Sequence, residues 1–142
     1  MPKILVADPI GAEGIELLRT HAEVDVKTGM KPPELLAVIS EYEGLLVRSE
    51  TKVTKEVIKT AGKLQVVGRA GIGVDNIDLD AATSAGIAVV NAPTGNTVAA
   101  AEHTMALMLA LSRNVPAAHQ SLKSGEWKRS AFVGVEVRNK TL

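Results

Sequence analysis

The sequence has no cysteine, hardly any aromatic residues and no excess of either charge. The absence of cysteine excludes disulfides, thiolate catalysis and zinc bound by cysteine. The aromatic residues are Tyr42, Trp127 and Phe132 alone, too few to build a surface on which nucleic-acid bases stack. Because 16 Lys and Arg residues balance 16 Asp and Glu residues, binding driven by nucleic-acid phosphates or by an anionic membrane is disfavoured.

Membrane, export and metal signals are lacking as well. Residues 98–111 are nearly all Ala, Met and Leu, but this stretch is too short to cross a bilayer and contains Glu102. The apolar residues 3–7 leave no room for a signal peptide ahead of them, so we expect a cytoplasmic protein. No pair of histidines has the spacing of metal ligands, and we predict no metal site.

What the sequence does contain is an alternation of short apolar runs with helical patterns. Asp78 is the predicted N-cap of one such helix, which ends near Gly86. Strands that alternate with short helices form a parallel sheet with helices on both faces. We therefore predict an α/β fold with five parallel strands. The predicted strands cover residues 3–7, 24–26, 44–47, 64–67 and 87–90.

The composition changes at residues 91–96, a turn-rich stretch that suits a hinge or a site loop. The helix predicted over residues 98–111 is apolar on almost every face. Such a pattern is typical of an element that is buried on several sides. A second, polar helix follows Pro116 and ends at Gly125.

Loops that follow the predicted strands form the candidate site, because ligands of an open parallel sheet bind beyond the carboxyl ends of its strands. Arg48 and Arg69 lie at two such ends, and Gly71 and Gly73 follow directly. An arginine fork suits a carboxylate or a phosphate, and glycine lets backbone N–H groups approach an anion. These residues predict a small organic ligand with several negative charges. The residue chemistry equally supports an alternative, in which the arginines are solvated and the glycines only form turns.

The glycines at 71 and 73 do not form a dinucleotide-binding fingerprint. Asn76 stands where the third glycine belongs, and no helix is predicted to start at once. About twenty residues further on, Asn91 replaces the acid that would hold a ribose. We predict that no pyrophosphate binds at this turn.

Three segments of the sequence resemble a known family. They are V-R-S-E-T-K-V-T (47–54), R-A-G-I-G-V-D-N-I-D (69–78) and N-A-P-T-G-N-T-V-A-A-A-E-H-T (91–104). Together they are similar to the NAD-dependent D-2-hydroxyacid dehydrogenases, and the resemblance extends over essentially the whole chain. The form G-N-T-V-A-A-A-E-H-T resembles the members that act on 3-phosphoglycerate rather than on lactate, formate or glycerate.

The resemblance implies a domain organisation and individual residue roles. Residues 1–97 would be a flavodoxin-like, doubly wound substrate-binding domain whose returning C-terminal segment is missing. Residues 98–142 would be linker helices that lead to an absent nucleotide-binding domain. Arg48 would lie near the substrate phosphate, and backbone N–H groups from Arg69 to Gly73 would hold the substrate carboxylate. The implied substrate-binding residues are Arg48, Ser49, Arg69, Ala70, Gly71, Gly73 and Asn96, and the implied cofactor contacts are Ile72 and Ala100.

The resemblance also implies an activity for the parent protein, the oxidation of 3-phosphoglycerate to 3-phosphohydroxypyruvate with NAD in serine biosynthesis. The catalytic arginine, glutamate and histidine of the family come later than the segment matching Leu142. We therefore expect this chain to be a fragment without activity and without bound NAD. Two alternatives are another D-2-hydroxyacid dehydrogenase and a non-catalytic module that associates with itself. A response-regulator receiver shares the fold class, but it needs clustered acids after the first strand, where only Asp8 is available.

Self-association is expected from the helix at Val98–Leu111, because the elements that would cover its apolar surface are not in this chain. Burying apolar surface is favourable by roughly 25 cal/mol per Å². We therefore expect a homodimer, a larger assembly or a domain swap built through this helix.

Overall fold

The computed structural model describes residues 1–141 of the chain. The chain divides into two units, Met1–Gly95 and Asn96–Leu142. The division falls inside the turn-rich stretch 91–96, close to the boundary expected after Thr97. Each unit is described below by itself.

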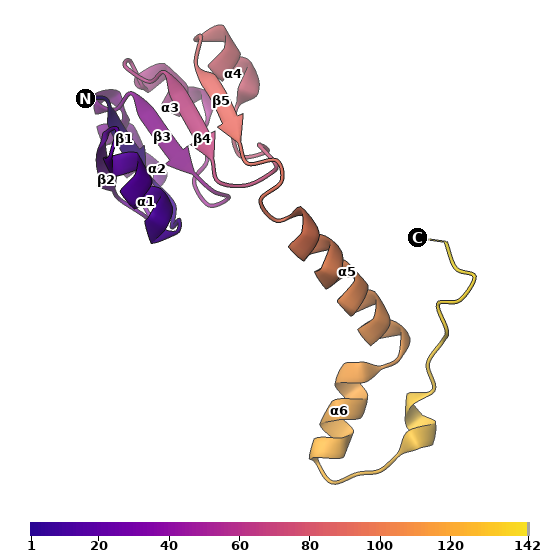
Figure 1. Cartoon of the computed structure of the whole chain (residues 1–142). Coiled ribbons are helices and arrows are strands. Elements are labelled where there is room, and N and C mark those ends of the chain that lie inside the picture. Colours follow the sequence, from indigo (N-terminus) through magenta and orange to yellow (C-terminus); the bar gives the residue numbers. More distant parts are fainter. Residues whose placement is uncertain (142) are drawn as a thin grey trace. The chain divides into compact units, whose positions relative to one another are not determined.

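The first unit is built on a five-stranded sheet (Figure 1). Neighbouring strands all pair in parallel, in the order β2-β1-β3-β4-β5. This is the order of flavodoxin-like sheets, and it confirms the predicted α/β fold. The strands are β1 (Lys3–Val6), β2 (Glu23–Val26), β3 (Gly44–Val47), β4 (Val66–Arg69) and β5 (Ala88–Asn91).

Helices connect the successive strands. They are α1 (Ala12–Arg19), α2 (Pro32–Val38), the short 3-10 helix η1 (Ile39–Glu41), α3 (Lys55–Thr60) and α4 (Leu79–Ser84). The N-cap predicted for α4 is confirmed, since an Asp78 carboxylate oxygen accepts a hydrogen bond from the Ala81 N–H at 2.9 Å. The chain leaves α4 through Gly86, whose φ of 70° lies in the left-handed region that favours glycine.

The core of this unit lies between one face of the sheet and the helices α2 to α4. Leu5, Leu45 and Val67 point into it from three strands, because alternate residues of a strand share a face. They pack with residues that α2, η1, α3 and α4 supply, including Leu35, Ile39, Val57, Ile58 and Ala82. By contrast, no residue of α1 is buried.

The fourth strand begins and ends later than predicted. It covers Val66–Arg69 rather than residues 64–67, because Leu64 still belongs to a turn in which its N–H donates to the Ala61 carbonyl. Leu64 is buried nonetheless, which explains why an apolar pattern placed it in the strand. Arg69 is therefore paired within the sheet, opposite Val47 on one side and Asn91 on the other.

The second unit consists of α5 (Thr97–Ser112), α6 (Val115–Lys123) and the 3-10 helix η2 (Arg129–Phe132). The segment after η2 returns to the end of α5, where the Val135 N–H donates to the Ser112 carbonyl at 2.8 Å. Gly134 lies so close to that carbonyl that a side chain would collide with it. Within residues 1–141, no helix is long and apolar enough to span a membrane.

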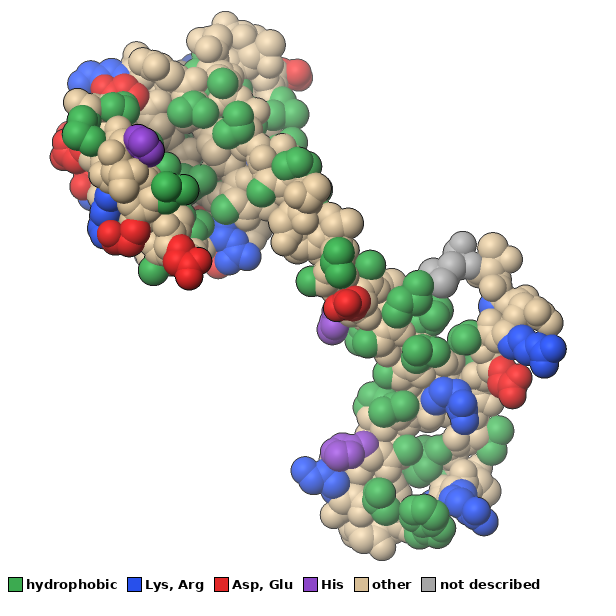
Figure 2. Space-filling model, in the orientation of Figure 1, with side chains coloured by type: hydrophobic (Ala, Val, Ile, Leu, Met, Phe, Trp, Pro, Cys, Tyr) green, Lys and Arg blue, Asp and Glu red, His purple; other side chains and the backbone are tan. Residues whose placement is uncertain are grey.

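The apolar helix α5 is not buried within this chain, and the expectation that a second copy covers it stays a prediction. No residue of α5 is buried, and Leu111 is 82% exposed. Figure 2 shows hydrophobic side chains gathered along this part of the molecule. The physical reason is that α6 and the returning segment supply too little apolar surface to cover every face of α5.

Candidate functional site

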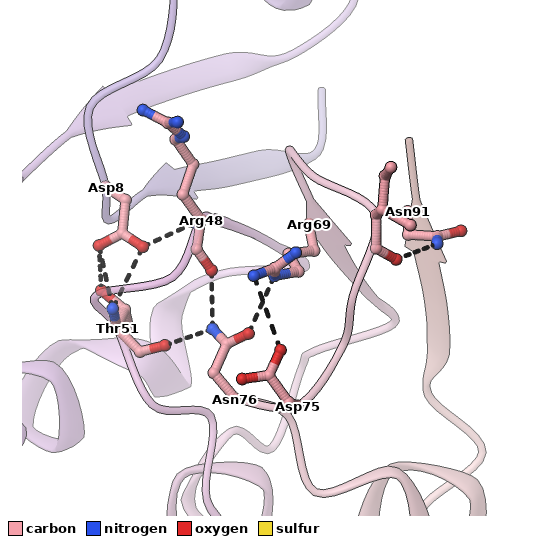
Figure 3. A network of polar contacts seen from close by, with 8 residues as sticks. Asp8, Arg48, Thr51, Arg69, Asp75, Asn76 and Asn91 are labelled. Carbon is pink, nitrogen blue, oxygen red and sulfur yellow. Dashed lines mark hydrogen bonds and ion pairs between the residues drawn. The ribbon is translucent and has the colours of Figure 1, made fainter. Parts of the chain in front are cut away.

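The carboxyl ends of β1, β3, β4 and β5 bring polar residues together at one edge of the sheet (Figure 3). Asp8 follows β1, Arg48 follows β3, and Arg69 and Asn91 end β4 and β5. The register places Val47, Arg69 and Asn91 side by side on neighbouring strands. This edge is where ligands of open α/β sheets bind.

Asp8 fixes the loop that follows β3. Asp8 is only 1% exposed, and its carboxylate accepts hydrogen bonds from the Arg48 N–H at 2.6 Å and from the Thr51 hydroxyl at 2.5 Å. The Thr51 N–H donates as well, at 3.1 Å. Burial by itself would raise the pKa of Asp8, but these hydrogen bonds outweigh it and hold the pKa below its ordinary value. Asp8 is therefore a buried carboxylate that organises the loop carrying Arg48.

Asn76 joins the loop after β3 to the loop after β4. The residue is 5% exposed, and its Nδ2 donates to the carbonyls of Arg48 and Thr51, both at 2.7 Å. The two loops are also stitched by an isolated bridge between Val53 and Ile77, with the Val53 N–H donating to the Asn76 carbonyl at 2.9 Å. Sequence reasoning treated Asn76 only as a substitute for a glycine and missed this role.

The Arg69 side chain packs against the loop that follows β4 and is not solvent-exposed. It is 13% exposed, and its Nε donates to the Asn76 Oδ1 at 3.0 Å. Its Nη2 lies 3.8 Å from a carboxylate oxygen of the exposed Asp75. A side chain at Gly71 would place its Cβ 2.7 Å from Arg69 Nη1. The glycine therefore makes room for the guanidinium, which the purely turn-forming interpretation does not explain.

Arg48 behaves differently. Its side chain is exposed and points away from Asn76 and Arg69 (Figure 3). In the described part of the chain its guanidinium takes part in no hydrogen bond or ion pair. The two guanidinium groups share one edge of the sheet without pointing toward one another. Neighbouring Ser49 is exposed as well.

Only part of the loop from Arg69 to Gly73 has N–H groups free for an anion. The Ala70 N–H donates to the Val47 carbonyl and the Gly71 N–H to the Arg69 carbonyl, each at 2.8 Å. The N–H groups of Ile72 and Gly73 donate to no group within residues 1–141. The donors available for a carboxylate are thus those of Ile72 and Gly73, while Ala70 and Gly71 shape the loop.

The last residue of β5 and the residue that follows it support this loop. Asn91 Nδ2 donates to the Ile72 carbonyl at 2.6 Å, and the Ala92 N–H donates to the Gly71 carbonyl at 3.0 Å. Asn96 and Ala100 belong to the second unit, where Asn96 is the N-cap of α5 and both residues are exposed. Their predicted roles at the substrate and the cofactor stay predictions.

Among the residues that the structure describes, the helix that follows Gly71 and Gly73 is α4, which begins only at Leu79, whereas a pyrophosphate-binding turn leads directly into a helix. The apolar side chain of Ile72 is exposed, and its predicted contact with a cofactor stays a prediction. The residues of this loop therefore do not fit a dinucleotide site of their own. Residues 1–141 contain no cluster of three or more His, Cys, Asp or Glu side chains that could hold a metal ion.

Comparison with known proteins gives a consistent picture. The sequence profile of the D-isomer specific 2-hydroxyacid dehydrogenase catalytic domain matches residues 4–139. The chain is 51% identical over 142 residues to a D-3-phosphoglycerate dehydrogenase of Synechocystis sp., in a match that covers 100% of this chain and 26% of that relative. The chain thus spans about a quarter of the length of the curated relative it matches.

Solved structures share the fold. The TT0316 protein from Thermus thermophilus matches with a TM-score of 0.84 and 31% identity, over 95% of this chain and 45% of that one. The NAD+-bound 3-phosphoglycerate dehydrogenase of Entamoeba histolytica matches with a TM-score of 0.70 and 30% identity, over 79% of this chain and 39% of that one. Since the family profile matches nearly the whole sequence, the chain belongs to the D-isomer specific 2-hydroxyacid dehydrogenase family.

Proposed function

We propose that this chain is the substrate-binding part of an enzyme that oxidises 3-phosphoglycerate to 3-phosphohydroxypyruvate with NAD, in serine biosynthesis. The observation that carries the proposal is the identity of about half of all residues with a D-3-phosphoglycerate dehydrogenase over the whole chain. The anion-binding chemistry of the sheet edge supports the same substrate class.

The substrate has a carboxylate at one end and a phosphate at the other. The N–H groups of Ile72 and Gly73, together with the Arg69 guanidinium, form a compact donor set that suits the carboxylate. Arg48 is exposed and points away from that set, which suits a second anionic group some distance along the ligand. We therefore assign the carboxylate to the loop after β4 and the phosphate to Arg48.

The reaction removes a hydride from the carbon that bears the hydroxyl group and a proton from the hydroxyl oxygen. NAD, when bound, supplies the acceptor for the hydride. The residues of this chain bind and orient the substrate, and the group that takes the proton lies outside it. We propose that the chain alone binds the substrate without turning it over, and an assay that detected NADH formation by these 142 residues would contradict this.

Ligand titrations of the isotope-labelled chain test the proposal. We expect 3-phosphoglycerate to shift the amide signals of Ile72 and Gly73 and the side-chain signal of Arg48. D-Glycerate, which lacks the phosphate, should shift the loop signals and leave Arg48 unchanged. Equal affinity for D-lactate would indicate another D-2-hydroxyacid dehydrogenase, and no response to any of the three ligands would indicate a non-catalytic module.

A pair of arginine variants sharpens this test. Arg48→Ala should weaken 3-phosphoglycerate binding at least about tenfold, because a charge-assisted hydrogen bond contributes about 1.5–3 kcal/mol, and should leave D-glycerate binding unchanged. Arg19→Ala is the matched control, because Arg19 lies on α1 and, among residues 1–141, its guanidinium pairs with Glu16 alone, at 2.7 Å. An equal loss in both variants would rule out a specific phosphate contact.

A specific observation also favours self-association. The apolar side chains of α5 are exposed, among them Val98, Leu107 and Leu111. We propose that a second copy of the chain covers them in a homodimer or a domain swap, because exposed apolar patches of this kind mark protein interfaces. Sedimentation that showed only monomer at high concentration would contradict the proposal. The expected cytoplasmic location stays a prediction.

A further inference from the structure

We propose that Asn76 is a positioning residue that fixes the orientation of the Arg69 guanidinium and couples it to the loop that carries Arg48. This inference rests on the proposed function, in which Arg69 helps to bind the substrate carboxylate. Asn76 itself is buried and is not expected to touch the ligand. Its effect would be exerted through Arg69 and through the backbone of the loop after β3.

The hydrogen bonds of Asn76 use every polar atom of its side chain. Oδ1 accepts from Arg69 Nε at 3.0 Å, and the two hydrogens of Nδ2 serve the carbonyls of Arg48 and Thr51. This position needs one acceptor and two donors on a short side chain, which an asparagine amide supplies. A carboxylate would place an acceptor against two carbonyl oxygens, and an apolar residue would leave all three partners without a bond.

The bond to Nε decides which atoms of Arg69 remain for a ligand. With Nε engaged, an anion can be bound in a bidentate manner only by Nη1 and Nη2. Nη1 lies beside the loop glycines, 2.7 Å from the place of a Cβ at Gly71 and 3.7 Å from that of a Cβ at Gly73. The Gly73 N–H is one of the two free donors of this loop. Asn76 thus holds the guanidinium next to the backbone donors with which it would share a carboxylate.

The bonds from Nδ2 tie this arrangement to the other anion-binding loop. The Arg48 carbonyl accepts from Asn76, while the Arg48 N–H donates to Asp8. The backbone of Arg48 is therefore fixed on both sides by buried polar side chains. The Asn76 amide therefore fixes the position of the Arg69 guanidinium, proposed to bind the carboxylate. It also fixes the backbone of Arg48, proposed to bind the phosphate.

The test follows the Arg69 Nε–H signal by NMR in the complete chain and measures affinity for 3-phosphoglycerate. In the wild type, we expect this hydrogen to exchange with water at least about tenfold more slowly than in a free arginine, because it is hydrogen-bonded and largely buried. Asn76→Ala should restore fast exchange and weaken 3-phosphoglycerate binding about tenfold. Fast exchange in the wild type would overturn the proposal without any variant.

Two further variants separate positioning from general stability. Asp78→Ala removes the N-cap of α4 without touching Arg69, and it should lower stability while leaving the Arg69 Nε–H protected. Gly71→Ala keeps every Asn76 bond to the loop after β3 but places a methyl group 2.7 Å from Arg69 Nη1, which is too close for both to stay in place. It should displace the guanidinium, speed the exchange of the Nε–H and weaken binding, even if Asn76→Ala failed to fold.

The possible failures are distinct. If Asn76→Ala and Asp78→Ala weakened binding equally, with Arg69 still protected in both, Asn76 would be only a structural residue and the proposal would be overturned. If the wild-type chain did not bind 3-phosphoglycerate, the proposed function would fail. Protection of Arg69 in the wild type and its loss in Asn76→Ala would still support the positioning role.

Discussion

The two units of this chain are both rich in apolar residues, yet they bury them to very different extents. In Met1–Gly95, strand residues such as Leu5, Leu45 and Val67 are almost completely buried between the sheet and its helices. In the second unit, α5 is more uniformly apolar than any of those helices, and none of its residues is buried. The comparison shows that an apolar composition does not by itself bury a helix. Burial also requires enough neighbouring elements to cover the apolar side chains.

The largest effect should come from truncating matched leucines in the two units. Leu45→Ala should lower the free energy of unfolding by about 2–5 kcal/mol, because it leaves a cavity in a closed core. Leu109→Ala, at an exposed position of α5, should lower the free energy of unfolding by less than about 1 kcal/mol. Urea denaturation at a concentration where the chain is monomeric measures both. Equal costs would show that α5 is covered in solution.

A second effect concerns the buried carboxylate of the first unit. Asp8→Asn should lower stability by about 1–3 kcal/mol, because the amide accepts fewer of the hydrogen bonds that Thr51 and Arg48 donate.

The same carboxylate predicts a pH dependence. Since the pKa of Asp8 is lower in the folded than in the unfolded chain, its contribution is complete above the unfolded value of about 3.9 and is lost as the pH falls toward the folded pKa. Unfolding curves from neutral to acid pH should therefore show the wild type losing more stability than Asp8→Asn. Parallel curves would contradict the assignment.

A third effect lies in the second unit and appears in assembly rather than in stability. Leu107→Lys should weaken self-association at least about tenfold, because it places a charge on the exposed apolar surface of α5. Sedimentation velocity over a range of concentrations measures it. Lys123→Glu, on α6, changes charge without removing apolar surface and should have little effect. Comparable losses in both variants would point to a charge-driven interface instead.

The smallest effect concerns an exposed residue of the first unit. It tests whether the exposure of a residue, rather than the unit in which it lies, determines how much its substitution lowers stability. Asp75 belongs to the first unit but is 81% exposed, and its carboxylate lies 3.8 Å from Arg69. Asp75→Asn should change stability by less than about 0.5 kcal/mol, as is usual for exposed ion pairs. Thermal unfolding measures this. A cost as large as that of Asp8→Asn would mean that Asp75 supports Arg69 more strongly than the exposed ion pair suggests.

Much of the first unit could be predicted from the sequence. Apolar runs at β1 and β3 and the N-cap at Asp78 depend on local chemistry, and they lie where the pattern predicted them. The boundary of β4 was misplaced because Leu64 is buried without being paired in the sheet. Burial and strand pairing are separate properties, and an apolar pattern reports only the first.

The candidate site was predictable in its residue types but not in its connections. Arginines and glycines at strand ends indicated an anion site, whereas Asp8 and Asn76 were not recognised as parts of it. A polar residue directly after a buried strand, as at Asp8, is a usable signal. Nothing local marks Asn76, whose partners lie 7 to 28 residues away in the chain.

The sequence by itself determined the succession of strands and helices along the chain, the apolar character of α5 and the motifs that place the chain in its family. These properties depend on residue types and on their spacing along the chain. Only the tertiary structure decided that the Arg69 guanidinium is held by Asn76 and that two of the loop N–H groups are already engaged. It also decided that, among residues 1–141, the Arg48 guanidinium has no partner and α5 has no buried residue. Each of these depends on which groups, distant in the sequence, lie next to one another in the fold. The partner of a hydrogen-bonding group and the cover of an apolar side chain are both set by those neighbours.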